Sequence, residues 1–274
     1  MGLISTIIVA ILQGITELFP VSSLGHAVVL PPLLRLQDMD IRSEQFLPLV
    51  VVLHLGTAIA LMAYFWRDWL GIAQAFFDRD PDRRRQQFRL LALVVVGTIP
   101  AVIAGFLLER HVREMFGSAY LAAFFLIVNG VLLFAVERLK QEGRNPITAL
   151  TIKDALIVGI WQGLALIPGI SRSGATIAGG LLLGLSHEAA ARFSFLLATP
   201  IILGAGVLEV PKLLKSGGHI TGVALVGGVV AGVTAFVATA ILMRWMKTHE
   251  FKALDPFAYY CIGFGALSLV LLTI

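Results

Sequence analysis

Apolar residues along this chain fall into ten segments, separated by shorter stretches that carry most of the charged residues. At about 1.5 Å per residue, a helix needs about 20 residues to cross the roughly 30 Å hydrocarbon core of a bilayer. In each half of the chain the first two segments are short, and the next three are long enough for each to cross the bilayer. We expect helices over 3–19, 24–36, 46–66, 90–108, 119–136, 152–168, 174–185, 191–209, 220–243 and 257–274.

The two halves also match in sequence. Shared residues recur 149 positions apart: Gln13-Gly14 as Gln162-Gly163, Ser22 as Ser171, and Gly25 as Gly174. A proline lies between the shared residues in both copies, Pro20 and Pro168. Polar residues repeated at one offset inside apolar segments favour an internal repeat over coincidence.

Each pair of short segments, interrupted by its proline, predicts a helical hairpin that enters the membrane and returns. Irregular backbone at membrane depth is stable only where protein or a wet cavity surrounds it. Each half then has one re-entrant hairpin plus three transmembrane helices, and an odd number of crossings places the second half upside down relative to the first. We expect one all-α integral membrane domain with an inverted-topology repeat, over 1–145 and 146–274, whose shared site lies near the midplane.

Composition supports this fold class. Hydrophobic residues make up 58% of the chain and charged residues 14%, and the mean hydropathy is +0.89; soluble domains carry roughly 25% charged residues. These values exclude a water-soluble globule and a disordered chain. Cys261 is the one cysteine, so the chain has no internal disulfide and no cysteine-based zinc site.

Loop charges predict the orientation. Under the expected topology, 14 of the 21 Lys and Arg lie on the side that carries 67–89 and 244–256, six lie on the other side, and Arg172 lies inside the second hairpin. The basic side should be cytoplasmic. Both termini and the mouth of the first hairpin then face outward. Because the basic residues are not interleaved with stacking aromatics, we do not expect a nucleic-acid partner.

The first hairpin carries a group of polar residues that could do chemistry. Gln13 and Glu17 are four residues apart and share one helix face, and a carboxylate in an apolar helix is a candidate functional residue. After the break at Pro20, Ser22 or Ser23 can cap the next helix, whose N-terminus suits an anion. Ser23 with His26 could form a nucleophile and its base, although a cap and a buried structural histidine explain the same spacing.

The second hairpin reads Pro168-Gly-Ile-Ser-Arg-Ser-Gly-Ala-Thr176. Arg172 is the one basic residue in the interior of an apolar segment and needs a partner, either Glu17 or an anionic ligand. Ser171, Ser173 and Thr176 add hydroxyl donors, and a guanidinium binds phosphate oxygens bidentately. The two breaks together suit a phosphate ester or pyrophosphate. By comparison, we expect His54 to be a packed, hydrogen-bonded histidine and Asn129 to bond between helices.

Three stretches resemble a known family: QGITELFPVSSLGH at 13–26, PGISRSGAT at 168–176 and FSFLLATP at 193–200. They are similar to the motifs of the undecaprenyl-diphosphatases, also called bacitracin resistance proteins. The resemblance covers nearly the whole chain. It implies a multi-pass enzyme of the bacterial cytoplasmic membrane that hydrolyses undecaprenyl pyrophosphate to the monophosphate and inorganic phosphate, recycles the cell-wall lipid carrier, and needs a divalent cation, Mg²⁺ or Ca²⁺.

Carried over by position, the resemblance implies Glu17 as an essential acid, Ser23 and His26 as catalytic candidates, and Arg172 as the pyrophosphate clamp. It also implies phosphate-contacting hydroxyls at Ser22, Ser171, Ser173 and Thr176. The cation would be held by Glu17 and Gln13, where many family members have a second glutamate. An amide oxygen can ligate a metal, but Gln13 cannot act as a base.

Two questions stay open at this point. The nucleophile could be Ser23, His26 or a water that His26 activates. The same intramembrane site would also fit a lipid or anion transporter, or flippase, because inverted repeats and broken helices are common in carriers. The partners expected are the polyprenyl pyrophosphate and membrane lipids; the sequence does not fix the oligomeric state.

Overall fold

The computed structural model of the chain is all-helical, and it describes residues 2–33, 46–115, 118–139, 144–215, 221–249 and 251–273. Short 3₁₀ turns at Ile147–Ala149 and Leu164–Leu166 flank the seventh helix. The described helices are α1 Leu3–Leu18, α2 Ser23–Leu33, α3 Phe46–Tyr64, α4 Trp66–Gln74, α5 Pro81–Met115, α6 Ala119–Leu139, α7 Ile152–Gly163, α8 Arg172–Leu182, α9 His187–Lys215, α10 Gly222–Thr248 and α11 Asp255–Thr273.

The long helices confirm a multi-pass membrane protein. Five of the described helices, α5, α6, α9, α10 and α11, are long and apolar enough to cross a bilayer. A sixth span is reached when α3 is joined with α4, two helices bent by 71° at their break. Large apolar side chains remain exposed on the outer faces of these helices, for example Val229 at 67% and Phe106 at 81%, as expected for surfaces that contact lipid.

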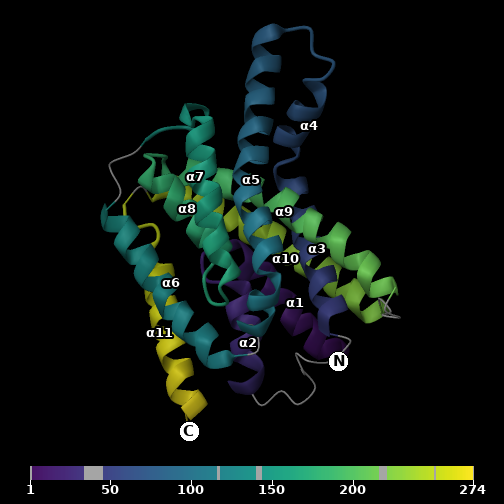
Figure 1. Ribbon diagram of the computed structural model, residues 1–274, viewed down its shortest axis with the longest axis vertical. Helices are drawn as coiled ribbons and strands as arrows, with labels where there is room; N and C mark the ends of the chain where they lie inside the picture. The colour runs from purple at the N-terminus through teal and green to yellow at the C-terminus, as the bar shows by residue number, and fades with distance from the viewer. Residues whose placement is uncertain are drawn as a thin grey trace.

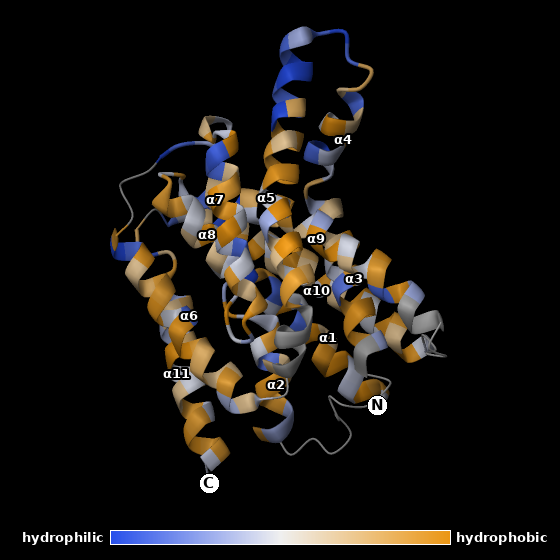
Figure 2. Cartoon of the chain, in the orientation of Figure 1, coloured by the Kyte–Doolittle hydropathy of each residue, from blue (hydrophilic) through white to orange (hydrophobic). Residues whose placement is uncertain are grey.

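The polar stretch 67–89, expected to be a loop, is mostly helical, and that expectation was wrong. It contains most of α4 and the first turns of α5, which project beyond the other helices in Figure 1. The first turns of α5 and the connection before them are strongly hydrophilic in Figure 2. Asp80 caps α5 by accepting from the backbone N–H groups of Asp82 and Arg83, at 3.0 and 3.4 Å, and Pro81 occupies the first helical position. Residues 34–36 of the second expected segment lie outside the described residues.

Both short pairs are helices interrupted at the expected place. Between α1 and α2, Ser22 adopts a positive φ of 67° and its Oγ accepts from the N–H of Gly25 at 3.2 Å, so Ser22 rather than Ser23 caps α2. Between α7 and α8, Gly169 has a φ of +100°, and Ser171 caps α8 by accepting from the N–H of Gly174 at 3.1 Å. Each break therefore ends at a serine-capped helix N-terminus.

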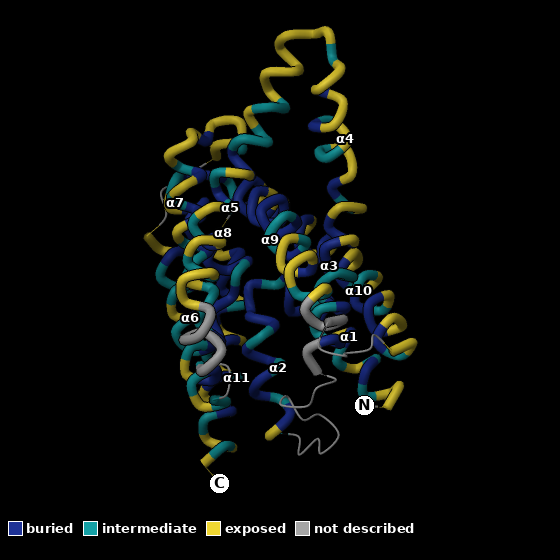
Figure 3. The backbone as a smooth tube through the Cα atoms, turned by 45° about the vertical axis from the view of Figure 1, so that its right-hand side comes forward, coloured by how far each residue is buried: buried dark blue, intermediate teal, exposed yellow. Residues whose placement is uncertain are grey.

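The two short helices that follow the breaks lie in the interior of the bundle. Figure 3 shows α2 buried along most of its length, between α6 and α11 on one side and α1 and α10 on the other. In α8, every residue from Ser173 to Leu181 is buried. The longer helices pair around them, with α3 on α10, α6 on α11, α1 on α10 and α5 on α7. Protein therefore surrounds both helix breaks, and such surroundings are what irregular backbone inside a membrane protein requires.

The termini lie at the end of the molecule opposite to the α4–α5 connection (Figure 1). The basic stretch 67–89 and the two termini are therefore on opposite sides of the bundle.

Candidate active site

A cavity of about 330 Å³ lies where the two helix breaks meet. Its polar lining comes from α1, α2, α3, α7, α8 and the two breaks, with Glu209 added from α9. Its apolar lining is mostly aliphatic and comes mainly from α2, α3, α9 and the turn after α7. The polar lining is Thr16, Glu17, Ser22, Ser23, His54, Gln162, Ser171, Arg172 and Glu209, and the apolar lining includes Leu24, Val50, Val51, Leu166, Ile201 and Ile202.

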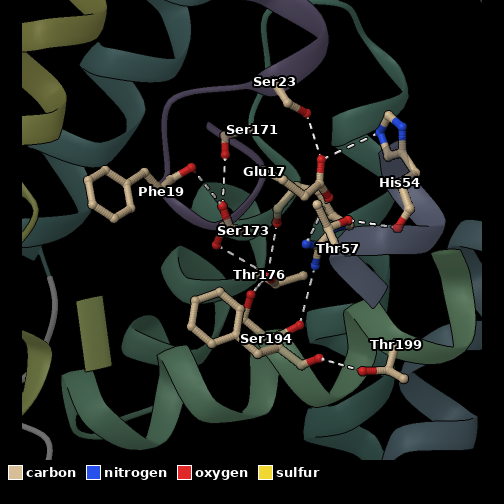
Figure 4. Close-up of polar contacts among 12 residues, drawn as sticks. Glu17, Phe19, Ser23, His54, Thr57, Ser171, Ser173, Thr176, Ser194 and Thr199 are labelled. Atoms are coloured by element: carbon tan, nitrogen blue, oxygen red, sulfur yellow. Dashed lines mark hydrogen bonds and ion pairs between the residues drawn. The ribbon is translucent and has the colours of Figure 1, made fainter. Parts of the chain in front are cut away.

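Glu17 is the centre of the polar end (Figure 4). One carboxylate oxygen, Oε2, accepts from Ser23 Oγ at 2.6 Å and from Gln13 Nε2 at 3.2 Å. The other, Oε1, accepts from the guanidinium of Arg172 at 3.2 Å. His54 Nε2 lies 3.5 Å from Oε2. Glu17 is only 8% exposed, and burying a charge is unfavourable unless the charge is paired. The four side chains around it, one from its own helix and three from other segments, supply that pairing.

Arg172 joins the two halves of the chain, because it starts α8 and reaches Glu17 on α1. Its second terminal nitrogen donates to the carbonyl of Ser194 on α9 at 3.3 Å. Its Nε has no hydrogen-bond partner among the residues that the structure describes. The guanidinium thus keeps donor capacity beyond the single bond to Glu17.

The structure brings Ser23 to Glu17 and not to His26. The ring of His26 points away from the cavity: Nδ1–H donates to the carbonyl of Ser22 at 2.7 Å, and Nε2 pairs with the hydroxyl of Tyr260 at 2.7 Å. The same ring stacks on Phe264 with centroids 4.8 Å apart. Both nitrogens of His26 are engaged, so in this conformation the group that can accept a proton from Ser23 is the carboxylate of Glu17.

The three hydroxyls of the second break have different surroundings. Ser171 lines the cavity, and its Oγ lies 3.0 Å from Ser173 Oγ. Ser173 donates to the carbonyl of Phe19 at 3.1 Å, which ties the second break to the first. Thr176 lies one turn deeper, 2.6 Å from Ser194 Oγ, and also bonds the carbonyl of Arg172 at 2.8 Å. In this conformation Ser171 can meet a ligand directly, whereas Ser173 and Thr176 brace the loop that presents it (Figure 4).

The sequence did not identify two of the residues that line the cavity as site residues. His54 is hydrogen-bonded as expected, with Nδ1–H donating to the Val50 carbonyl at 2.8 Å, but its Nε2 faces Glu17. Gln162, the repeat partner of Gln13, lines the cavity, and its side-chain oxygen has no partner among the described residues. The signal for Gln162 was present in the 149-residue repeat. No sequence signal placed His54, because α3 is apolar on all sides.

Oxygen ligands for a divalent cation are sparse. Among the described residues, no group of three or more His, Cys, Asp or Glu lies close enough to hold a metal ion. Glu17 is one carboxylate, and Gln13 turns its amide nitrogen toward it. Mg²⁺ is typically held by one or two carboxylates together with substrate phosphate oxygens and water. Gln13 does not line the cavity, whose carboxylates among the described residues are Glu17 and Glu209. A cation at the polar end would therefore take most of its ligands from a bound pyrophosphate and water, with Glu17 as the expected protein ligand that faces the cavity.

The arrangement combines three chemical capacities in one place. Arg172 and two capped helix N-termini offer positive potential and hydrogen-bond donors for an anion. Ser23 offers a hydroxyl 2.6 Å from a carboxylate that can accept its proton. The aliphatic wall offers space for a hydrocarbon chain. Together these features suit an amphiphile with an anionic head.

Comparison with known proteins gives one consistent match. The model of the family described as bacitracin resistance protein BacA matches residues 6–267. A protein named undecaprenyl-diphosphatase from Gluconacetobacter diazotrophicus is 52% identical, over 99% of this chain and 98% of its own. Proteins of the same name from Granulibacter bethesdensis, at 51% identity, and Mycolicibacterium paratuberculosis, at 43%, are covered to 97% of their length.

Proposed function

This chain belongs to the bacitracin resistance protein BacA family, and we infer that it is an undecaprenyl-diphosphatase, a membrane hydrolase that cuts undecaprenyl pyrophosphate and so recycles the cell-wall lipid carrier. Its similarity to proteins of that name extends over nearly the full length of both chains. The observation that carries the site assignment is the meeting of Glu17, Ser23 and Arg172 in a cavity whose other wall is aliphatic.

We propose that the pyrophosphate occupies the polar end of the cavity and the polyprenyl chain follows the aliphatic wall. Arg172 would take the head group with parallel charge-assisted hydrogen bonds, assisted by the hydroxyls of Ser22 and Ser171. Ser173 and Thr176 would act from behind by holding the loop. Binding an anion at Arg172 also replaces part of its interaction with Glu17, which frees the carboxylate for proton transfer.

We propose Ser23 as the nucleophile and Glu17 as its base. Ser23 Oγ forms a bond to the terminal phosphorus while the bond from phosphorus to the bridging oxygen breaks and undecaprenyl phosphate leaves. Glu17 accepts the hydroxyl proton and passes it to the leaving phosphate. A water then attacks the phosphoserine, giving inorganic phosphate and regenerating the hydroxyl. Arg172 and the helix N-termini stabilise charge on the phosphoryl group in both steps.

The short contact between Ser23 and Glu17 supports this assignment over a Ser23–His26 pair, whose histidine is engaged by Ser22 and Tyr260. His26 would then hold the first turn of α2 in place. Glu17, with the side-chain oxygen of Gln13, would hold a divalent cation, Mg²⁺ or Ca²⁺, and the cation would supply charge neutralisation for the pyrophosphate.

We also propose that the fold is an inverted-topology repeat, with 1–145 and 146–274 as its halves and the cavity opening to the extracytoplasmic side. The support is the order of five helices common to both halves once α4 is left out, the residues that recur 149 positions apart, and the excess of Lys and Arg on one side.

Phosphate release tests the function. Purified protein in detergent is given undecaprenyl pyrophosphate, with and without EDTA, and inorganic phosphate is measured. The phosphatase produces one phosphate per lipid, and EDTA stops it. A protein that only transports or flips the lipid through the same site produces none, and that result would reject the enzyme assignment.

A further inference from the structure

Asn129 lies in the middle of α6, is fully buried and does not line the cavity. Its side chain nevertheless bonds to both helix breaks. The amide nitrogen donates to the carbonyl of Pro20, in the first break, at 3.0 Å. The amide oxygen accepts from the backbone N–H of Ser171, in the second break, at 3.0 Å. One side chain thus connects the two loops that present the site.

The direction of this amide is fixed by its partners. A backbone carbonyl can only accept and a backbone N–H can only donate, so a rotated amide would lose both bonds. Both bonds are buried, and leaving a polar group unpaired in a protein interior is unfavourable. The two bonds of Asn129 therefore hold the loops in one relative position.

The residues attached to these loops are those of the proposed reaction. Ser23 follows Pro20 by three positions, and Arg172 is the residue next to Ser171. A shift of either loop changes the position of the hydroxyl relative to the guanidinium. Because catalytic groups must be held within a fraction of an ångström of productive geometry, the bridge at Asn129 acts on the reacting centre without touching it.

Glycine packing shows how closely the loops and α6 fit. A Cβ built on Gly169, which has a φ of +100°, would lie 2.4 Å from the carbonyl oxygen of Ala122 on α6. A Cβ on Gly25 would lie 3.2 Å from the Cα of Gly169, which places the first turn of α2 directly against the second loop. The second loop thus rests on α6 at Ala122 and is tied to it again at Asn129.

We propose that Asn129 is a positioning residue of the phosphatase, setting the distance between the nucleophile of the first repeat and the anion clamp of the second. The proposal rests on the function proposed above. It assigns to α6 the role of a common support for both half-sites. Asn129 affects the rate of phosphoryl transfer, while the aliphatic wall that binds the lipid chain is left unchanged.

Steady-state kinetics of two variants test the role. Asn129→Leu is close in size and removes both hydrogen bonds to the breaks, together with the 3.4 Å contact from the amide nitrogen to Cys261 Sγ. We expect its kcat to fall by about tenfold to a hundredfold, the range produced by a misplacement of about 1 Å, with KM for undecaprenyl pyrophosphate near the wild-type value. Asn129→Asp keeps an acceptor for the Ser171 N–H and loses the donor to Pro20, so its kcat should lie between those of Asn129→Leu and the wild type.

Thr239→Val is the matched control. Thr239 is also fully buried, and its hydroxyl bonds within its own helix, to the carbonyl of Ala235 at 2.7 Å. All four proteins are compared for kcat, KM and melting temperature in detergent. A loss of kcat confined to the two Asn129 variants supports the proposal. Equal kcat in Asn129→Leu and Thr239→Val, or a change in KM alone, overturns it.

The wild-type assay tests the proposed function, and the variants test the role of Asn129. If Asn129→Leu does not insert or fold, the same comparison is made with Asn129→Asp, and a wild-type kcat in that variant overturns the proposal. If the wild-type protein itself releases no phosphate, the proposed function has failed. Wild-type turnover with unaffected Asn129 variants rejects the positioning role alone.

Discussion

Replacing Arg172 by lysine keeps a positive charge at the polar end of the cavity and removes the planar fork of donors. In the structure the guanidinium contacts Glu17 at 3.2 Å and the Ser194 carbonyl at 3.3 Å with two different nitrogens, and its Nε is left without a partner among the described residues. A lysine ammonium can replace one of these contacts as a point charge, but cannot hold a phosphate with two parallel bonds.

The expected loss of activity in Arg172→Lys can be worked out from the hydrogen-bond donor that is lost. Removing one preorganised donor to a developing oxyanion costs about 2–4 kcal/mol of transition-state stabilisation. At 1.36 kcal/mol per tenfold, kcat/KM of Arg172→Lys should fall by roughly 30- to 900-fold. The variant should still insert, because an ion pair with Glu17 remains possible.

The assay is phosphate release from undecaprenyl pyrophosphate in detergent, with expression and melting temperature measured in parallel. Arg138→Lys is the matched control, since Arg138 makes a bidentate pair with Asp255 at 2.8 and 3.1 Å and does not line the cavity. It should keep wild-type kcat/KM. Normal turnover of Arg172→Lys would refute the clamp. A second result would also refute it. If Arg172→Ala misfolds and adding Glu17→Ala restores expression, the two residues form a structural ion pair.

Three further outcomes are expected. Glu17→Gln should abolish turnover because it removes the base and the carboxylate ligand, while Gln13→Glu should be tolerated; near-normal phosphate release by Glu17→Gln would contradict both roles. His54→Phe should lower kcat, because it replaces the polar group that faces Glu17 at 3.5 Å by a ring, and an unchanged pH–rate profile with unchanged kcat would show that His54 only packs. Cysteine labelling in intact cells should leave 67–89 and 244–256 protected from an impermeant reagent and both termini accessible; labelling of 67–89 from outside would reverse the orientation.

Hydropathy located the helices well and their ends poorly. The segment 90–108 corresponds to α5, which runs from Pro81 to Met115. Apolar character marks the part of a helix that contacts lipid or protein, whereas backbone hydrogen bonds continue into water wherever a cap and compatible residues allow. Asp80 and Pro81 supply that start. The helix α4 was missed for a related reason, since its apolar residues cover only one face and do not raise the average hydropathy.

The two breaks were predictable because proline and glycine act locally. Pro20 lies two positions after the end of α1, where its missing donor and its clash with the preceding turn prevent the helix from continuing. The α-helix of α7 ends earlier than its proline, at Gly163, and Pro168 follows the 3₁₀ turn Leu164–Leu166. Which serine caps α2 depended on the backbone at Ser22, whose φ of 67° no residue-level pattern indicates. That choice matters, because capping by Ser22 leaves the hydroxyl of Ser23 for Glu17.

Spacing along the sequence did not predict the contacts of the two histidines His26 and His54. His26 is three residues from Ser23, yet the turn of α2 directs its ring toward Tyr260 and Phe264 on α11. His54 is far from Glu17 in the sequence and close to it in space. Proximity along a helix can be counted in residues, whereas proximity between helices depends on how α3 packs beside α1. The bridge made by Asn129 is of the same kind, since its partners Pro20 and Ser171 lie in different halves of the chain.

An experimental structure of Ser23→Ala with bound undecaprenyl pyrophosphate tests the central claim most directly. The variant lacks the proposed nucleophile and should retain uncleaved lipid. The account predicts the terminal phosphate against Arg172 and residue 23, between the N-termini of α2 and α8, with the polyprenyl chain along the aliphatic wall of the cavity. A pyrophosphate bound beside His26 and Tyr260, or anywhere outside this cavity, would contradict it.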